Sequence, residues 1–211
     1  MADRRAHILA VTRQLMAESD GAVAMRSLAE RSGVALATIY NIFGGQERLV
    51  AAALADMFNH RLPAWHTESQ NAPFAIVDER IDAALAEIWR EPVFAKRMSQ
   101  MFFSHDATDE AARLLHDLPI QFYTKQAQGL RSAGLLRPEI DIHTWADDQL
   151  AIAFAIIARW ATGHIGDDEL ASRLRGVVFA HLESSLTDQG RRDLAAYVRC
   201  SAPAFDGADL A

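Results

Sequence analysis

The chain has 211 residues, enough for one compact domain or two small ones. Half of the residues are hydrophobic and 23% are charged, a composition that excludes a disordered, collagen-like or mucin-like protein. The single cysteine, Cys200, excludes an internal disulfide framework and a cysteine-rich zinc site, so we expect a reducing, cytoplasmic location. The longest apolar run, residues 150–158, is shorter than the about 20 residues of a membrane span, so we expect no membrane partner.

Charge is distributed unevenly along the chain. The formal net charge is −7, yet residues 1–62 carry seven basic and six acidic side chains, whereas the remainder carries 14 and 22. This asymmetry indicates that only the N-terminal part meets a polyanion.

Predicted helices follow one another along the whole chain. Apolar residues recur at helical spacing, glycine and proline fall between the periodic segments, and no segment alternates as a strand does. The sequence therefore predicts an all-α fold of nine or ten helices, with a break at Pro119 and a weaker last helix. The expected ranges are 4–18, 25–31, 36–42, 46–62, 74–89, 92–103, 107–132, 140–162, 168–187 and 189–199.

Residues 25–43 have the spacing of a helix-turn-helix, in which two short helices pack across a tight turn. Ala29 is small where the second helix must approach, Gly33 can adopt the positive φ of the turn, and Ile39 can pack back onto the first helix. An ordinary helical corner is the alternative. An amphipathic helix before the segment and a further helix directly after it favour the helix-turn-helix.

This part of the chain resembles the TetR (tetracycline-repressor-like) family. The similarity rests on the run SLAERSGVALATIYNIFGGQERLVAAAL, residues 27–54, and on the helix before it. The resemblance implies a three-helix DNA-binding domain, residues 1–46, and a C-terminal bundle for effector binding and dimerisation, residues 47–211, connected by helix 46–62. It also implies a homodimeric transcriptional regulator, most often a repressor that a small molecule releases from a pseudo-palindromic operator.

The second short helix would then lie in the major groove of double-stranded DNA. Side chains at 36–38 and Asn41 can reach base edges or thymine methyl groups, and Tyr40 suits a phosphate oxygen. The glycine pair before the fourth helix leaves backbone N–H groups that can hold a phosphate. The expected DNA-binding residues are Arg26, Leu36, Ala37, Thr38, Tyr40, Asn41, Gly45 and Gln46.

Three residues depart from the family pattern at positions that bear on phosphate binding. Ala24 and Ala35 stand where the family usually has Thr and Ser, and Gln46 stands where a Lys usually meets the DNA backbone. Each departure removes a hydroxyl group or a charge, so we expect weak DNA affinity or binding confined to low salt. The alternative function is a ligand-binding or protein-interaction module of the same fold with weakened DNA binding.

The C-terminal body is rich in aromatic residues, and the resemblance implies that it holds an effector pocket. Methionine adapts to varied apolar ligands, and a glutamine among aromatic residues can orient one. Aromatic and methionine side chains at helical spacing are otherwise ordinary core residues. For a mostly apolar or aromatic small-molecule effector, the expected ligand-binding residues are Trp89, Met98, Phe102, Phe122 and Gln126.

Helices 140–162 and 168–187 are the expected subunit contact. Two such helices from each chain form a four-helix interface with two-fold symmetry, which would place two recognition helices about 34 to 36 Å apart, one turn of DNA. The expected interface residues are Ile152, Leu174, Val178 and Leu182.

We expect neither a metal nor a cofactor. The acidic cluster between Asp141 and Asp148 includes His143 at a spacing that a metal could use, but acids in the first turns of a helix also oppose its positive end. No enzyme motif is present, so catalysis in an aromatic pocket is the weakest alternative.

Overall fold

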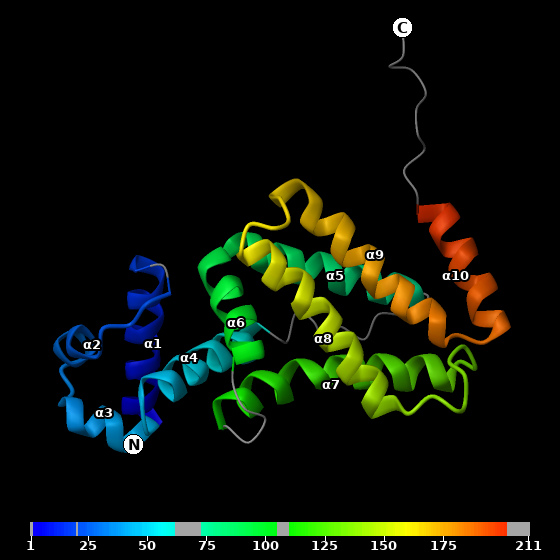
Figure 1. Cartoon of the computed structure of the whole chain (residues 1–211). Helices are drawn as coiled ribbons and strands as arrows, with labels where there is room; N and C mark the ends of the chain where they lie inside the picture. The colour runs from blue at the N-terminus through cyan, green and yellow to red at the C-terminus, as the bar shows by residue number, and fades with distance from the viewer. Residues whose placement is uncertain (1, 20, 62–72, 105–109, 202–211) are drawn as a thin grey trace, which may run out of the picture.

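The computed structural model describes residues 2–19, 21–61, 73–104 and 110–201. Within these ranges the structure is all-helical apart from an isolated bridge between Leu136 and Leu186, which confirms the predicted fold class (Figure 1). Its ten helices are α1 (Ala2–Glu18), α2 (Met25–Ser32), α3 (Leu36–Phe43), α4 (Gln46–Arg61), α5 (Pro73–Arg90), α6 (Pro92–Ser104), α7 (Glu110–Ser132), α8 (Ile142–Ala161), α9 (Asp167–Ser185) and α10 (Asp188–Ser201).

Helix α7 continues through Pro119, so the predicted break there is wrong. A proline inside a helix removes one backbone hydrogen bond and costs about 3 kcal/mol. Pro119 is buried, however, and α7 packs along both α4 and α8, so tertiary packing holds the helix across the proline. The first residues predicted for this helix, 107–109, lie outside the described residues.

Helices α1 to α3 and the first turns of α4 form the head, shown in blue at the left of Figure 1. Leu28 of α2, Ile39 of α3 and Leu49 of α4 are fully buried in its core. Gly33 ends α2 with a φ of 62°, and the next backbone N–H, of Val34, donates to the Ala29 carbonyl at 3.2 Å. The helix-turn-helix predicted over residues 25–43 is therefore present.

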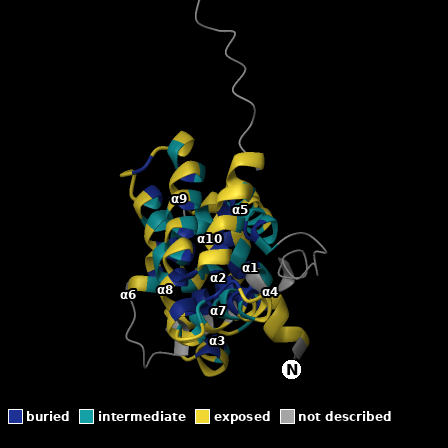
Figure 2. Cartoon of the chain, turned by 90° about the vertical axis from the view of Figure 1, so that its right-hand side faces the viewer, coloured by how far each residue is buried: buried dark blue, intermediate teal, exposed yellow. Residues whose placement is uncertain are grey.

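Helices α5 to α10 form the body, in which α8 packs against α6, α7 and α9. Buried residues lie where these helices meet and exposed residues point outward (Figure 2). Asp78 of α5 joins three helices, because it accepts from Arg175 Nε of α9 at 2.8 Å and from Tyr197 Oη of α10 at 3.0 Å.

The head and the body share one hydrophobic cluster. Phe94 and Met101 of α6 and Leu115 of α7 belong to the same buried cluster as the core of the head. Helix α4 is central to it, since it packs against α1 on the head side and against α6 and α7 on the body side. A displacement of α4 therefore also shifts residues of the head.

Acidic residues at two helix starts act as caps. The Asp141 carboxylate accepts the Thr144 backbone N–H at 2.8 Å, and these hydrogen bonds lower the pKa of Asp141. At the start of α9, Glu169 accepts the Gly166 backbone N–H at 3.2 Å. Within the ranges given above, no three acidic, histidine or cysteine side chains come together as metal ligands. The arrangement supports the capping interpretation of the acidic cluster.

Helices α2 and α3 begin without a side-chain cap. Ala24 and Ala35 occupy the N-cap positions with extended backbone dihedrals, φ −78° and ψ 112° for Ala24, and neither can accept a backbone N–H. Both helices of the helix-turn-helix thus lack a hydrogen bond that Ser or Thr would supply.

We predict that Ala24→Ser and Ala35→Ser each raise the free energy of unfolding by about 0.5 to 2 kcal/mol, because the hydroxyl supplies the missing cap. Urea denaturation followed by circular dichroism measures the change. Ala86→Ser, at an exposed position inside α5, is the matched control and should be slightly destabilising. Equal effects at all three positions would contradict the capping argument.

Candidate nucleic-acid interface and ligand cavity

Helix α3 presents one face to solvent. Ile39 and Phe43 are buried and anchor the helix to the head. Ala37, Tyr40 and Asn41 are exposed and lie three and four positions apart, so they share the opposite face. Tyr40 is 44% exposed and is not a core residue, whereas Phe43 is one. The structure thus leaves this face available to a partner.

The other expected DNA-binding residues lie on α2, on α3 and at the start of α4. Leu36 and Thr38 are half-buried at its edge, and Arg26 is exposed at the start of α2. Gly45 and Gln46 lie at the start of α4, where the first backbone N–H groups have no helical acceptor. Gly45 and Gln46 follow closely after the end of α3.

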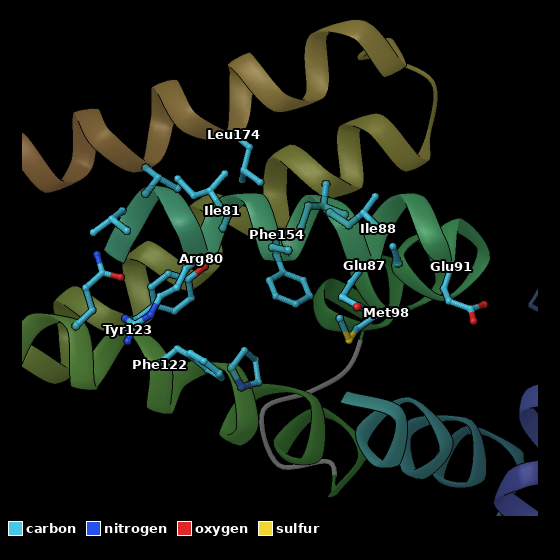
Figure 3. Close-up of a pocket in the computed structure, with 18 of the residues that line it drawn as sticks. Arg80, Ile81, Glu87, Ile88, Glu91, Met98, Phe122, Tyr123, Phe154 and Leu174 are labelled. Carbon is cyan, nitrogen blue, oxygen red and sulfur yellow. The ribbon is translucent and has the colours of Figure 1, made fainter. Parts of the chain in front are cut away.

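The body contains an apolar cavity of about 130 Å³ between α4 and α9 (Figure 3). Helix α5 supplies one long wall, from Val77 to Ile88, which spans about 16 Å along the helix axis at 1.5 Å per residue, and Glu91 follows directly after the helix. Phe122 of α7 and Phe154 of α8 face it across the cavity. Met57, in the last turns of α4, also lines it.

Three of the five expected ligand-binding residues line this cavity, namely Met98, Phe122 and Gln126. Trp89 does not, because it is 43% exposed and packs edge-on against Trp160, with ring centroids 5.6 Å apart. Phe102 does not line the cavity either. Its ring stacks on the ring of Phe154, which does line the cavity, with ring centroids 4.4 Å apart. The structure therefore brings together only part of the expected set.

Sequence reasoning missed four polar residues of the cavity, Arg80, Glu87, Glu91 and Tyr123. A charged residue in an amphipathic helix normally faces solvent, and nothing in the pattern of α5 signals an inward arginine. Burial lowers the pKa of Arg80 and raises the pKa of Tyr123 to about 12, so the phenol remains protonated. The Arg80 guanidinium also lies over the Phe122 ring, 5.9 Å from its centroid.

Two nitrogen atoms of this lining lack an acceptor. Arg80 Nη1 and Gln126 Nε2 are buried and have no hydrogen-bond partner among the described residues. An unpaired buried donor costs free energy, which a ligand with an acceptor oxygen would recover.

Three of the four expected interface residues point into the chain itself. Leu174 and Val178 line the cavity and Leu182 is fully buried, so these three side chains are directed into the chain's own bundle in this structure. Each helix has two faces, and the apolar stripe of α9 faces its own bundle. Ile152 of α8 is half-buried. The outward face of α9 carries small residues instead, among them Gly176, where an added Cβ would meet nothing within 4 Å.

Within the part of the chain that the structure covers, no helix is long and apolar enough to cross a membrane.

No family-level sequence model matches the chain. The sequence is 28% identical over 202 residues to the HTH-type transcriptional repressor KstR of Rhodococcus jostii (strain RHA1), covering 90% of this chain and 86% of that protein. The fold is similar to that of a TetR transcriptional regulator from Rhodococcus sp. RHA1, with a TM-score of 0.69 and 20% identity over 86% of this chain and 96% of that one. It is also similar to Thermus thermophilus FadR, a TetR-family repressor in complex with lauroyl-CoA, with a TM-score of 0.65 and 19% identity over 87% and 95% of the two chains.

The two structural neighbours share the all-helical architecture, and the curated relative is similar over nearly the whole chain. The helix-turn-helix at residues 25–43, with its exposed second helix, provides the local feature that such regulators need. The chain therefore has the fold of TetR-family transcriptional regulators and is similar in sequence to a helix-turn-helix transcriptional repressor over most of its length.

Proposed function

We propose that the chain is a homodimeric, cytoplasmic repressor that a small molecule in the body cavity releases from a pseudo-palindromic operator. The observation that carries this proposal is the position of Met57, which lines the cavity and also packs against the core of the head. A ligand in the body thereby touches the helix on which the DNA-binding head rests.

The exposed face of α3 is the proposed base-reading surface. Asn41 can donate to and accept from a base edge, and Ala37 can contact a thymine methyl group. Tyr40 and the backbone N–H groups at Gly45 and Gln46 would fix the helix against phosphates. In this division, Asn41 determines sequence preference and Tyr40 contributes to affinity for any sequence.

The cavity volume supports a mechanism in which the ligand displaces its walls. About 130 Å³ is close to the volume of an engineered cavity that holds benzene, so a larger apolar effector must push side chains aside. Met57 and Met98 are flexible, and both pack against the cluster of the head. To act as a switch, the effector must bind the DNA-free arrangement more tightly than the DNA-competent one.

Dimerisation through the outward faces of α8 and α9 supplies the two-fold symmetry that a pseudo-palindromic operator requires. These faces carry Ile152 and Ala155 on α8, and Gly176 and Ala180 on α9. Small residues allow two helices to approach closely, which supports a four-helix contact between two copies.

A second candidate function is a ligand-binding module with weakened DNA binding. The absence of side-chain caps at Ala24 and Ala35 and of a cation at Gln46 favours it. Binding to fragments of the source genome distinguishes the two candidates. Only the regulator should bind such fragments with a sequence preference and with an affinity that falls as the salt concentration rises.

The first prediction concerns the DNA-reading face. Tyr40→Ala should weaken binding to all DNA sequences several-fold, whereas Asn41→Ala should cost about 1 to 3 kcal/mol at one base position and relax the preference there. Fluorescence anisotropy with selected and altered fragments measures both. Gln128→Ala, at an exposed position on α7, is the control. Unchanged affinity in Tyr40→Ala or unchanged preference in Asn41→Ala would contradict the docking.

The second prediction concerns a substitution whose larger side chain fills the cavity in place of a ligand. Ala84 lines the cavity from the middle of α5, so Ala84→Phe should fill it and reduce DNA affinity by about 5- to 150-fold. Ala86→Phe places the same ring on the exposed side of α5 and should leave DNA affinity unchanged. Circular dichroism establishes that both variants fold. A folded Ala84→Phe variant with full DNA affinity would show that the cavity is not coupled to the head.

The third prediction concerns the subunit contact. Gly176→Arg puts a charge on the outward face of α9 and should produce monomers with strongly reduced operator affinity. Gly129→Arg is the matched control, because Gly129 is also an exposed helical glycine with open space around it, but on α7. Sedimentation velocity measures the mass of each. A dimeric Gly176→Arg variant would exclude this face as the interface.

A further inference from the structure

The cavity is polar only near its two ends. Arg80 and Tyr123 lie at one end, and Glu87 and Glu91 lie toward the other, beyond Phe154 (Figure 3). Gln126 also lines the cavity and lies about one helical turn along α7 from Tyr123. Arg80 and Glu87 are seven residues apart on α5, about 10 Å along its axis, and Glu91 follows directly after the helix. The walls between these ends are apolar. A ligand that fills the cavity therefore meets a positive charge at one end and negative charges at the other.

Arg80 is a charged lining residue of the cavity, and it has no ion-pair partner among the described residues. Glu87 is paired with Arg90 outside the cavity, through Arg90 Nη1 to Glu87 Oε1 at 2.6 Å. The positive charge of Arg80 faces the Phe122 ring and the neutral Tyr123 phenol, and its Nη1 has no acceptor. Arg80 is half-buried, but its Nη1 is shielded from solvent without a carboxylate partner, which is costly, and a bound anion would offset that cost.

Gln126 strengthens the case for an acceptor at this end. Its side chain is buried, and its Nε2 also lacks an acceptor. Gln126 and Tyr123 lie three positions apart on α7, so they share the face that lines the cavity opposite Arg80 of α5. A carboxylate has two oxygen atoms, which can accept from the arginine and the glutamine together.

We propose that the effector is an apolar carboxylic acid whose carboxylate is bound by Arg80 and Gln126, with its hydrocarbon body extended along α5 toward Met98. This inference rests on the proposed function, because it specifies the ligand class of the same cavity. The carboxylate is placed at the Arg80 end because the other end carries acidic residues and no cation among the lining residues.

Isothermal titration with a series of eight-carbon probes tests the proposal. Octanoate should bind most tightly, octanamide about tenfold more weakly because it lacks the charge, and octylamine not measurably. Arg80→Met should weaken octanoate binding by about tenfold or more while changing octanamide binding little. Arg80→Lys should restore part of the octanoate affinity, because it keeps the charge but not the guanidinium geometry. Arg199→Met, an exposed arginine on α10, should bind octanoate as the unmodified chain does.

Four results would overturn the assignment. The first is octylamine bound as tightly as octanoate, and the second is octanoate affinity unchanged in a folded Arg80→Met variant. The third is binding of octanoyl-CoA, titrated as an additional probe, without binding of the other three, and the fourth is absence of binding by every probe at millimolar concentration. DNA binding without any probe tests the proposed function separately. If the protein binds operator DNA but does not discriminate octanoate from octylamine, only the proposed ligand class is refuted. If it prefers octanoate but never binds DNA, only the proposed function as a DNA-binding regulator is refuted.

Discussion

The packing of α4 between two sets of neighbours is the constraint on which the rest of the structure depends. Its first turns complete the core of the head, where Leu49 is fully buried, and its side chain Met57 reaches the body cavity. Protein interiors are close-packed and transmit strain, so a helix held on both sides cannot shift at one end alone. This explains how an apolar cavity can influence a DNA-binding face that it does not touch.

Local patterns were sufficient to predict the head. Gly33 and Ile39 identify the helix-turn-helix because the tight turn needs a positive φ and the second helix needs a buried anchor, and both requirements act within a few residues. The continuity of α7 through Pro119 was not predictable in the same way. It depends on packing against α4 and α8, which lie far from Pro119 in sequence.

The body shows where sequence reasoning ends. Met98, Phe122 and Gln126 were selected by residue type and do line the cavity, but residue type cannot distinguish them from Phe102, which supports the wall from behind. The apolar stripe of Leu174, Val178 and Leu182 indicates a buried face without saying whether the burial is within or between subunits. Arg80 was missed because its inward direction depends on how α5 is rotated against the bundle. That rotation is set by contacts such as Arg175 with Asp78.

The spacing between the two recognition helices is the quantity that the proposed switch must change. It can be measured by pulsed electron spin resonance on a Cys200→Ser chain that carries a spin label at Glu30→Cys, an exposed position on α2. The account predicts a distance distribution between two subunits that shifts when Ala84→Phe fills the cavity and does not shift with Ala86→Phe. A distribution that is identical in all three proteins, or the absence of any distance between subunits, would contradict it.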